Sequence, residues 1–480
     1  MTDSHKPLSR RVQAALLFFV LIASELCAVA VAPNFIVILT DDQGWGTTSV
    51  MMDPLVPESK SDFFRTPNIE KLAASGMRFS QAYASHCNCS PSRASLQTGR
   101  SPAALHLTDI IDRNRGPMYE GNKLIPPHHL AALPKDNATI PQLLKARNPD
   151  YQAGHFGKWH LAGGGPQNYG YDVSDGATGN RMGDRAENLP DDPKKIFSVT
   201  RRAIEFMQAQ VKAGHPFYLQ VSHYATHEVN QSRPATREKF QQATKGQRHD
   251  NVPYGAMLAD LDMGIGQLLD AVKAAGIMDH TYIIYTSDNG SIPTDDPGSL
   301  NGPLHGWKAS VWEGGIRVPF MVVGPGVKPG TVNRTPVIGY DILPTICDLA
   351  GATNWPKTVE GGSLKPALLG EAKAAVKRPE DFLVFHWPHY QHARHSTPDT
   401  TILADGWKLH YWWETGQVQL FELDLDLGES KDLATKQPER ASNLKSRLTN
   451  YLATIKAQLP VPNPDFKSSR APVTQSEPAP

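Results

Sequence analysis

The chain has 480 residues, enough to bury a large core and to form one big domain with a smaller one, or two to three domains. Lys and Arg total 48, as do Asp and Glu, so the net charge is zero with His neutral. This balance provides neither a basic surface for nucleic acid nor an acidic tail, so no nucleic-acid partner is expected. Four cysteines are too few for a disulfide framework in an exported chain: Cys27, Cys87, Cys89 and Cys347.

Residues 1–32 have the pattern of a secretory signal peptide. Basic residues precede an apolar run at 12–23, and small residues follow at Ala28, Ala30 and Ala32. The run is too short for a transmembrane helix, and an uncleaved interfacial anchor is the alternative. We therefore predict an exported protein, periplasmic or secreted, without stable membrane association once the signal is cleaved.

Short apolar runs alternate with helical patterns between residues 33 and 375. Continuous apolar runs at 34–40, 217–221 and 282–285 predict strands that are buried on both faces. Helices are expected at 198–213 and 254–275, because apolar residues recur there every three or four positions. This alternation indicates an α/β fold with a large, mostly parallel sheet between helices, and we assign residues 33–375 to it as the main domain.

The pattern changes after about residue 370. Strand-like runs separated by turn residues predict a smaller antiparallel sheet, packed with a helix at 441–458; the runs are 382–385, 401–403, 407–412 and 419–423. We therefore predict a C-terminal α+β subdomain at 376–460. Residues 461–480 are rich in Pro and Ser and are expected to be disordered.

Two predicted strands end in pairs of oxygen-bearing side chains. Asp41-Asp42 follows the first strand, and Asp288-Asn289 follows the strand at 282–285. Taken singly, each pair favours a turn cap over a metal site, a role that Asp and Asn often have. Two such pairs at the same end of one sheet favour a bound hard cation, Ca²⁺ or Mg²⁺, because the donors are all oxygen.

Cationic and imidazole side chains also gather after strands. They are Lys158, His160, His223, His227 and Lys308. Lysine is able to hold an oxyanion, and histidine is able to donate a proton near neutral pH. Four more histidines lie close together in a later loop: His386, His389, His392 and His395. Their spacing follows no standard pattern of zinc ligands, and we expect them to form a substrate-facing lip of the site.

Cys89-Ser90-Pro91-Ser92-Arg93, followed by Thr98-Gly99-Arg100, resembles the signature of type I, formylglycine-dependent sulfatases of the alkaline-phosphatase-like superfamily. Similar segments recur in the family's order along most of the chain, from Asn34 to about Ala434: 40–44, 157–160, 287–290 and 313–319. The resemblance, which extends to bacterial arylsulfatases and glycan sulfatases, implies an alkaline-phosphatase-like fold. It also implies that the chain hydrolyses sulfuric esters.

The resemblance implies that a maturation enzyme oxidises Cys89 to Cα-formylglycine. The hydrated aldehyde would attack sulfur, form a covalent sulfate intermediate and release sulfate in a second step. The implied Ca²⁺, with Mg²⁺ less favoured, would be held by residue 89 together with four others: Asp41, Asp42, Asp288 and Asn289.

The same resemblance assigns the remaining roles by matching residues. Arg93 would stabilise the diol, and His160 would take its proton. Lys158 and Lys308 would neutralise sulfate oxygens. His227 would act as general acid, sharing that task with Lys308, while His223 would lie behind the site.

The chain departs from the family pattern at Gln97, where an apolar residue is usual, and at Cys87-Asn88 before the signature. A pairing of Cys87 with Cys347 stays open. Besides a sulfatase acting on a sulfated carbohydrate or an aryl sulfate, two alternatives remain. One is a phosphodiester or phosphonate ester hydrolase, and the other is a catalytically dead sulfated-glycan binding protein. The loops at 47–65, 101–135, 162–192 and 386–395 do not reveal which sugar is bound.

Overall fold

A computed structural model of the chain describes residues 32–111, 121–184, 189–294, 298–371, 375–394 and 396–466. The expected signal peptide, apart from its last residue, and most of the expected tail lie outside these residues. Within them, no helix has the length and apolar character needed to cross a membrane.

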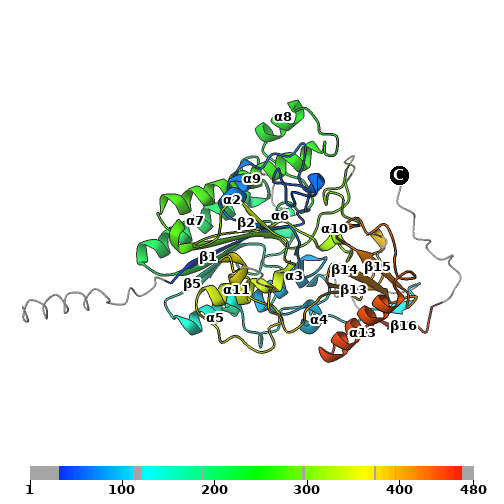
Figure 1. The fold of residues 1–480 in the computed structure, drawn as a ribbon. Coiled ribbons are helices and arrows are strands. Elements are labelled where there is room, and N and C mark those ends of the chain that lie inside the picture. Colours follow the sequence, from blue (N-terminus) through cyan, green and yellow to red (C-terminus); the bar gives the residue numbers. More distant parts are fainter. Residues whose placement is uncertain are drawn as a thin grey trace, which may run out of the picture.

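The described residues form a large sheet with strand order β10-β2-β9-β8-β1-β7-β5-β6 (Figure 1). β1 (Asn34–Thr40) lies at its centre, parallel to β7 (Phe217–Ser222) and to β8 (Thr281–Ser287). Every residue of these three strands is buried, as their continuous apolar runs predict. β5 (Gln152–Gly157) extends the parallel part beyond β7. The predicted parallel core is confirmed.

The far side of β8 carries the antiparallel part of the sheet. β9 (Phe320–Val323) pairs antiparallel with β8 and with β2 (Met77–Phe79). β10 (Thr331–Asn333) then adds in parallel to β2. The sheet is therefore mixed at this edge, and β6 (Val173–Ser174) forms the opposite edge.

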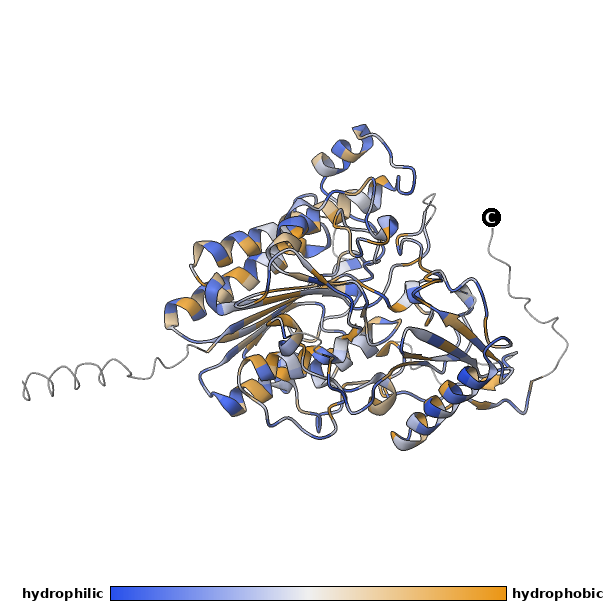
Figure 2. Ribbon diagram, viewed as in Figure 1, coloured by the Kyte–Doolittle hydropathy of each residue, from blue (hydrophilic) through white to orange (hydrophobic). Residues whose placement is uncertain are grey.

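Helices cover both faces of the sheet (Figures 1 and 2). Alternate residues of β1 point to opposite faces, so Ile36 and Ile38 join one core and Phe35 and Val37 the other. The first core includes residues of α2 (Pro67–Ser75), α7 (Ile196–Ala213) and α9 (Val252–Ala274). The second includes residues of α3 (Cys89–Thr98), α5 (Ile140–Arg147) and α11 (Ile342–Leu349).

A second sheet follows in the C-terminal part, as predicted. Its four strands are antiparallel, in chain order: β12 (Leu383–Trp387), β13 (Asp399–Ala404), β14 (Trp407–Trp412) and β15 (Val418–Glu422). α13 (Pro438–Thr454) packs on one face through Leu444 and Leu448. The other face packs against Tyr83 and Ile338 of the larger part (Figure 1). The domain boundary near residue 375 stays a prediction.

The expectation of disorder from residue 461 onward does not hold at the start of that segment. β16 (Val461–Pro462) pairs antiparallel with β4 (Leu124–Ile125), and the Asn463 backbone N–H donates to the Lys123 carbonyl at 2.9 Å. Backbone pairing, which composition does not reveal, orders these residues.

The remaining described elements are short, except for α8. They are η1 (Pro57–Ser59), β3 (Ala82–Tyr83), α4 (Pro102–Leu105), η3 (Pro166–Tyr169), α6 (Arg181–Asp184), η4 (Pro193–Lys195), α8 (Pro234–Gln242), η5 (Met278–His280), α10 (Glu313–Ile316), β11 (Val337–Ile338), η6 (Gly339–Asp341), α12 (Lys365–Leu368) and η7 (His392–Arg394). The sequence patterns did not identify α8.

Candidate active site

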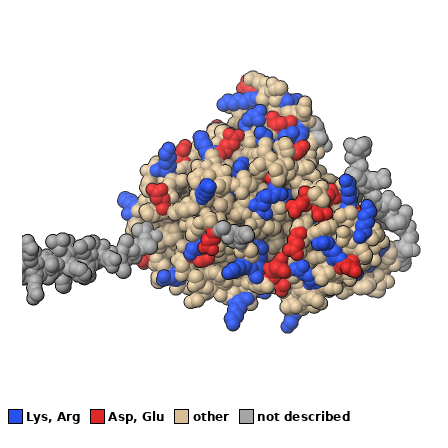
Figure 3. All heavy atoms as spheres, in the orientation of Figure 1, with Lys and Arg blue, Asp and Glu red and all other residues tan. Residues whose placement is uncertain are grey.

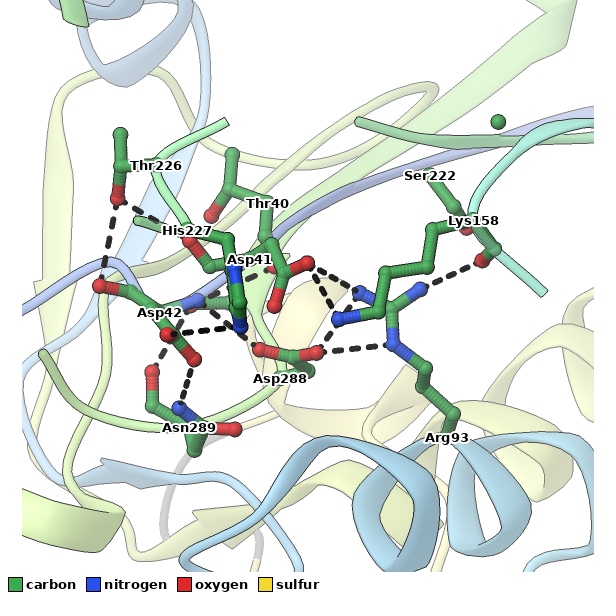
Figure 4. Close-up of polar contacts among 12 residues, drawn as sticks. Thr40, Asp41, Asp42, Arg93, Lys158, Ser222, Thr226, His227, Asp288 and Asn289 are labelled. Carbon is green, nitrogen blue, oxygen red and sulfur yellow. Dashed lines mark hydrogen bonds and ion pairs between the residues drawn. The ribbon is translucent and has the colours of Figure 1, made fainter. Parts of the chain in front are cut away.

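The two oxygen-rich pairs meet at the C-terminal ends of β1 and β8. Thr40 and Ser287 lie side by side in the register of these strands, so the residues that follow them emerge together. The backbone N–H of Asp42 donates to Asp288 Oδ1 at 3.1 Å, and Asn289 Nδ2 donates to Asp42 Oδ1 at 2.7 Å (Figure 4). The predicted convergence of the two pairs is present in the structure.

Cys89 is the first residue of α3, and this helix brings it to the same strand ends. The Cys89 sulfur and carboxylate oxygens of Asp41 and Asp288 all lie within 4.8 Å of one another. Across the described ranges, this is the one group of three or more His, Cys, Asp or Glu side chains arranged to hold a metal ion. Asp41 Oδ1 and Asn289 Oδ1 are buried there without a hydrogen-bond partner. Such oxygens fit a hard cation.

Three cationic side chains surround these carboxylates. Lys158 Nζ lies 2.5 Å from Asp41 Oδ2, and Lys308 Nζ lies 2.7 Å from Asp42 Oδ2. Arg93 approaches Asp288 Oδ2 with Nε at 2.8 Å and with a terminal nitrogen at 2.7 Å (Figure 4). Three buried carboxylates thus face three buried cations, which balances the local charge before any ion is added.

This arrangement shifts the acidities of the carboxyl groups. Burial opposes ionisation of Asp41, but Lys158, followed by His227 and Arg93, holds the pKa of Asp41 well below its usual range. Burial, together with the negative charge of Asp41, raises the pKa of Asp288 to about 6.

The Cys89 thiol is poorly suited to act as a thiolate. Burial raises its pKa to about 12, although Lys158 and Lys308 act in the opposite direction. Only a small fraction of the thiol would be ionised near neutral pH, and the thiolate is the nucleophilic form of cysteine. The unmodified thiol of Cys89 is therefore a weak nucleophile at this position.

The predicted histidines occupy different positions around this cluster. His227 Nε2 lies 3.8 Å from Asp42 Oδ2, so this ring faces the carboxylates (Figure 4). His160 is buried two residues beyond Lys158, and its backbone N–H donates to the Thr178 carbonyl at 2.8 Å. His223 is buried after β7, and burial lowers its pKa to about 4.

The family models match this chain over most of its length. Residues 33–352 match the model described as Sulfatase, and residues 304–458 match N-sulphoglucosamine sulphohydrolase, C-terminal. The chain belongs to the sulfatase family. It is thus a sulfuric ester hydrolase with the alkaline-phosphatase-like fold.

Several known sulfatases align with most of this chain. N-acetylgalactosamine-6-sulfatase of Homo sapiens is 30% identical over 430 residues, which cover 82% of this chain and 74% of the relative. A sulfatase of Formosa agariphila is 27% identical over 530 residues, 94% of each chain. The crystal structure of Ps i-CgsB in complex with k-i-k-neocarrahexaose superposes with a TM-score of 0.71 at 25% identity, covering 88% of this chain and 93% of that chain.

The His-rich segment of the sulfatase differs from the expectation of a substrate-facing lip. His386 and His389 are buried, and their rings bond to Thr400 Oγ1 at 2.7 Å and Thr108 Oγ1 at 2.8 Å. Burial lowers the pKa of His386 to about 4. His386 is part of β12, which continues to Trp387, further than predicted, and His389 follows it with its ring bonded to Thr108. His392 is exposed in η7, and His395 lies outside the described residues.

The cysteines of the sulfatase form no disulfide in the part of the chain that the structure describes. Cys87, Cys89 and Cys347 are free and buried. The Cys87 carbonyl accepts the backbone N–H of Ala309 at 2.9 Å, which fixes the segment that carries Lys308 beside the segment that carries Cys89. Cys87 therefore acts as a buried packing residue at the site.

Two residues near His227 were not identified from the sequence. Asp184, at the end of α6, contacts the His227 ring, and Lys194 of η4 contacts Asp184. Neither belongs to a recognisable motif. Only the folded chain brings them together.

Proposed function

We propose that this sulfatase is an exported enzyme that removes sulfate from a sulfated carbohydrate, with residue 89 as nucleophile after conversion of Cys89 to formylglycine. The observation that carries the proposal is the buried cluster of Cys89, Asp41 and Asp288. The printed names of relatives support the substrate class, since one is an N-acetylgalactosamine-6-sulfatase and one was solved with a neocarrahexaose. Cleavage of residues 1–32 as a signal peptide would account for export.

The chain offers an all-oxygen set for a calcium ion next to residue 89. Asp41, Asp42, Asp288 and Asn289 would hold it, and two of their oxygens lack any other partner. When bound, Ca²⁺ supplies Lewis-acid chemistry and positive charge for the sulfate group. Mg²⁺ fits less well, because it demands stricter octahedral geometry and retains several waters.

The modified residue would provide an oxygen nucleophile in the position of the thiol. Formylglycine supplies an aldehyde hydrate with two hydroxyl groups, one for attack on sulfur and one for release of sulfate. Arg93 is fixed between Asp288 and the Lys158 carbonyl, the latter at 2.6 Å, so its guanidinium is able to orient the hydroxyls. His160 would accept the proton of the second hydroxyl.

Two lysines would bind the oxygens of the sulfate group, and one histidine would donate a proton to the departing alcohol. Lys158 and Lys308 place ammonium groups against Asp41 and Asp42, where a bound cation would compete for the carboxylates and leave the ammonium groups for sulfate oxygens. His227 faces the same carboxylates and would protonate the departing alcohol oxygen, together with Lys308.

The test is turnover by protein coexpressed with a formylglycine-generating enzyme. Mass spectrometry of the peptide containing Cys89 should show the mass loss of thiol-to-aldehyde conversion. Sulfated mono- and oligosaccharides, aryl sulfates and phosphate diesters are then compared as substrates. We expect hydrolysis of sulfated saccharides, and a loss of about 10³-fold or more in Cys89→Ala.

Other outcomes would assign the protein differently. Preferential turnover of phosphate diesters would favour a phosphoester hydrolase. Binding of sulfated glycans without turnover by fully matured protein would indicate a binding protein. Full hydrolysis by Cys89→Ala would refute residue 89 as nucleophile.

A further inference from the structure

The His227 ring contacts two acceptor groups through Nδ1, one on Glu228 and one on Asp184. His227 Nδ1 lies 2.7 Å from the Glu228 carbonyl oxygen and 3.2 Å from a carboxylate oxygen of Asp184. Both groups only accept hydrogen bonds when Asp184 is ionised, so Nδ1 must carry the hydrogen. The opposite nitrogen, Nε2, then faces the carboxylate cluster at 3.8 Å from Asp42 Oδ2.

Lys194 holds Asp184 in this position. Its Nζ lies 2.6 Å from Asp184 Oδ1, and the Lys194 side chain is completely buried. Although burial favours the neutral carboxyl group, His227 and Lys194 lower the pKa of Asp184. An ionised Asp184 is thus bonded on one side to an ammonium group and on the other to an imidazole.

The local structure around Lys194 is costly. Burying a lysine is unfavourable unless its ammonium group is well paired. Lys194 and Lys195 also have left-handed backbones, with φ of 53° and 55°, a strained conformation for residues other than glycine. Strain of this kind persists where the surrounding structure enforces it, often beside an active site.

The segment that carries Asp184 also touches the other proposed proton-transfer residue. The backbone of Thr178 accepts from His160, and a Cβ built at Gly179 would lie 3.6 Å from the His160 ring. Among the described residues, His223, on the same loop as His227, has no hydrogen-bond partner for its own Nδ1. Of these two histidines, Asp184 contacts the one that faces the carboxylates.

We infer that Asp184, held by Lys194, is a positioning residue that keeps the Nδ1–H of His227 in place, so that the doubly protonated ring donates its Nε2 proton to the departing oxygen of the ester. This inference rests on the proposed function, because it requires His227 to act as general acid. Sulfate esters with poor leaving groups need a proton donor more than those with good leaving groups. A defect in positioning should therefore depend on the leaving group.

The experiment compares Asp184→Asn with the unmodified sequence on a series of phenyl sulfates, from 4-nitrophenyl sulfate to unsubstituted phenyl sulfate. We expect kcat on phenyl sulfate to fall about 10- to 100-fold, by analogy with the loss of hydrogen-bond partners that orient metal-bound histidines. The fall on 4-nitrophenyl sulfate should be several times smaller, with KM nearly unchanged. Asp260→Asn is the matched control, since Asp260 is a buried carboxylate that bonds Arg233 at 2.9 Å, outside the site described above.

Two further variants separate positioning from folding. Asp184→Glu keeps the carboxylate and should recover part of the lost kcat. In a His227→Gln background, Asp184→Asn should cause no further loss, because the residue acts through that ring. An equal fall on every substrate, or a full additional loss in the double variant, would overturn the inference. If the unmodified, matured protein hydrolyses no sulfate ester, the proposed function itself fails instead.

Discussion

Gln97 donates a 2.7 Å hydrogen bond from Nε2 to Gln220 Oε1, and both side chains are buried. The hydroxyl of Tyr171 lies 2.9 Å from both amide oxygens, and the Tyr218 hydroxyl donates to Gln220 at 3.0 Å. These partners lie on β7 and near β6, so they join α3 to the sheet. The polar residue in place of an apolar one is therefore matched by polar partners, and α3 keeps its position.

Replacing Gln97 alone should destabilise the fold. Gln97→Leu removes one hydrogen-bond partner each from Gln220 and Tyr171, which still bond to each other, and we expect a loss of about 0.5–1.5 kcal/mol in the free energy of unfolding. Urea unfolding followed by circular dichroism measures it. The double variant Gln97→Leu/Gln220→Leu should lose less than the sum of the single variants.

Gln242→Leu is the control, because Gln242 is exposed on α8. Strictly additive losses for Gln97 and Gln220 would show that the two amides do not act as a unit.

At the level of single residues, the sequence predicted the membership of the cluster but not its contacts. Asp41, Asp42, Asp288 and Asn289 follow buried strands directly, so their meeting at one sheet edge follows from parallel topology. No sequence pattern predicts the contacts of Asp184 and Gln220. Their partners come from segments that only tertiary packing brings close to them. The same packing buries His386 and His389, which a loop pattern had suggested were exposed.

At the scale of elements, the long strands and helices were predictable and the short ones were not. α7 and α9 repeat their apolar residues over several turns, and the structure begins each two residues earlier than expected. β2 and β10 have three residues each, too few for any periodicity, so the mixed edge of the sheet was missed. α3 was not recognised because its residues are buried on all sides and show no polar face.

α10 is held by a buried charge network from the C-terminal sheet. Lys408 of β14 lies 3.1 Å from Glu313 Oε1 and 2.9 Å from Glu429 Oε1, with all three side chains fully buried. The backbone N–H of Glu313 donates to Glu429 at 2.7 Å. α10 in turn contacts the strand end, since the Gly315 carbonyl accepts from Gly290 at 3.0 Å. The smaller sheet therefore supports α10, which follows the segment that carries Lys308 and bonds to Gly290, next to Asn289.

Removing the ammonium group of Lys408 from this network should strongly destabilise the fold. Lys408→Met removes the buried ammonium group between Glu313 and Glu429 and leaves these carboxylates only Arg317 and His410 as charged or imidazole partners, and we expect a loss of about 3–5 kcal/mol in the free energy of unfolding. Thermal and urea unfolding of the variant would measure it. Lys431→Met, at an exposed position of the same C-terminal part, should change stability by less than about 0.5 kcal/mol. Equal stability of Lys408→Met and the unmodified sequence would contradict this role for the network.

At the scale of the whole molecule, the site depends on segments spread over most of the chain. Residues from β1, α3, β5, the loop after β7, β8 and the segment before α10 converge on it (Figures 1 and 4). Outside the site, the face in Figure 3 shows acidic and basic side chains interspersed, in keeping with the zero net charge. Three carboxylates and three cationic side chains are concentrated in the buried site, where a bound ion would link distant segments to one another.

Binding of a cation at this site should stabilise the entire fold, because the unfolded chain cannot reproduce a set of ligands from β1 and β8. At a concentration of 100 times the dissociation constant, Ca²⁺ would add about 2.7 kcal/mol to the free energy of unfolding. We expect the melting temperature of chelator-treated protein to rise on addition of Ca²⁺, and to rise less with Mg²⁺. Asp288→Asn should abolish the rise and reduce bound calcium, measured by elemental analysis, from one ion per chain to near zero. Asp260→Asn should retain both, since its buried carboxylate bonds Arg233 and is no part of the cluster. An undiminished calcium response in Asp288→Asn would place the ion elsewhere, and no response in the unmodified sequence would refute the calcium site.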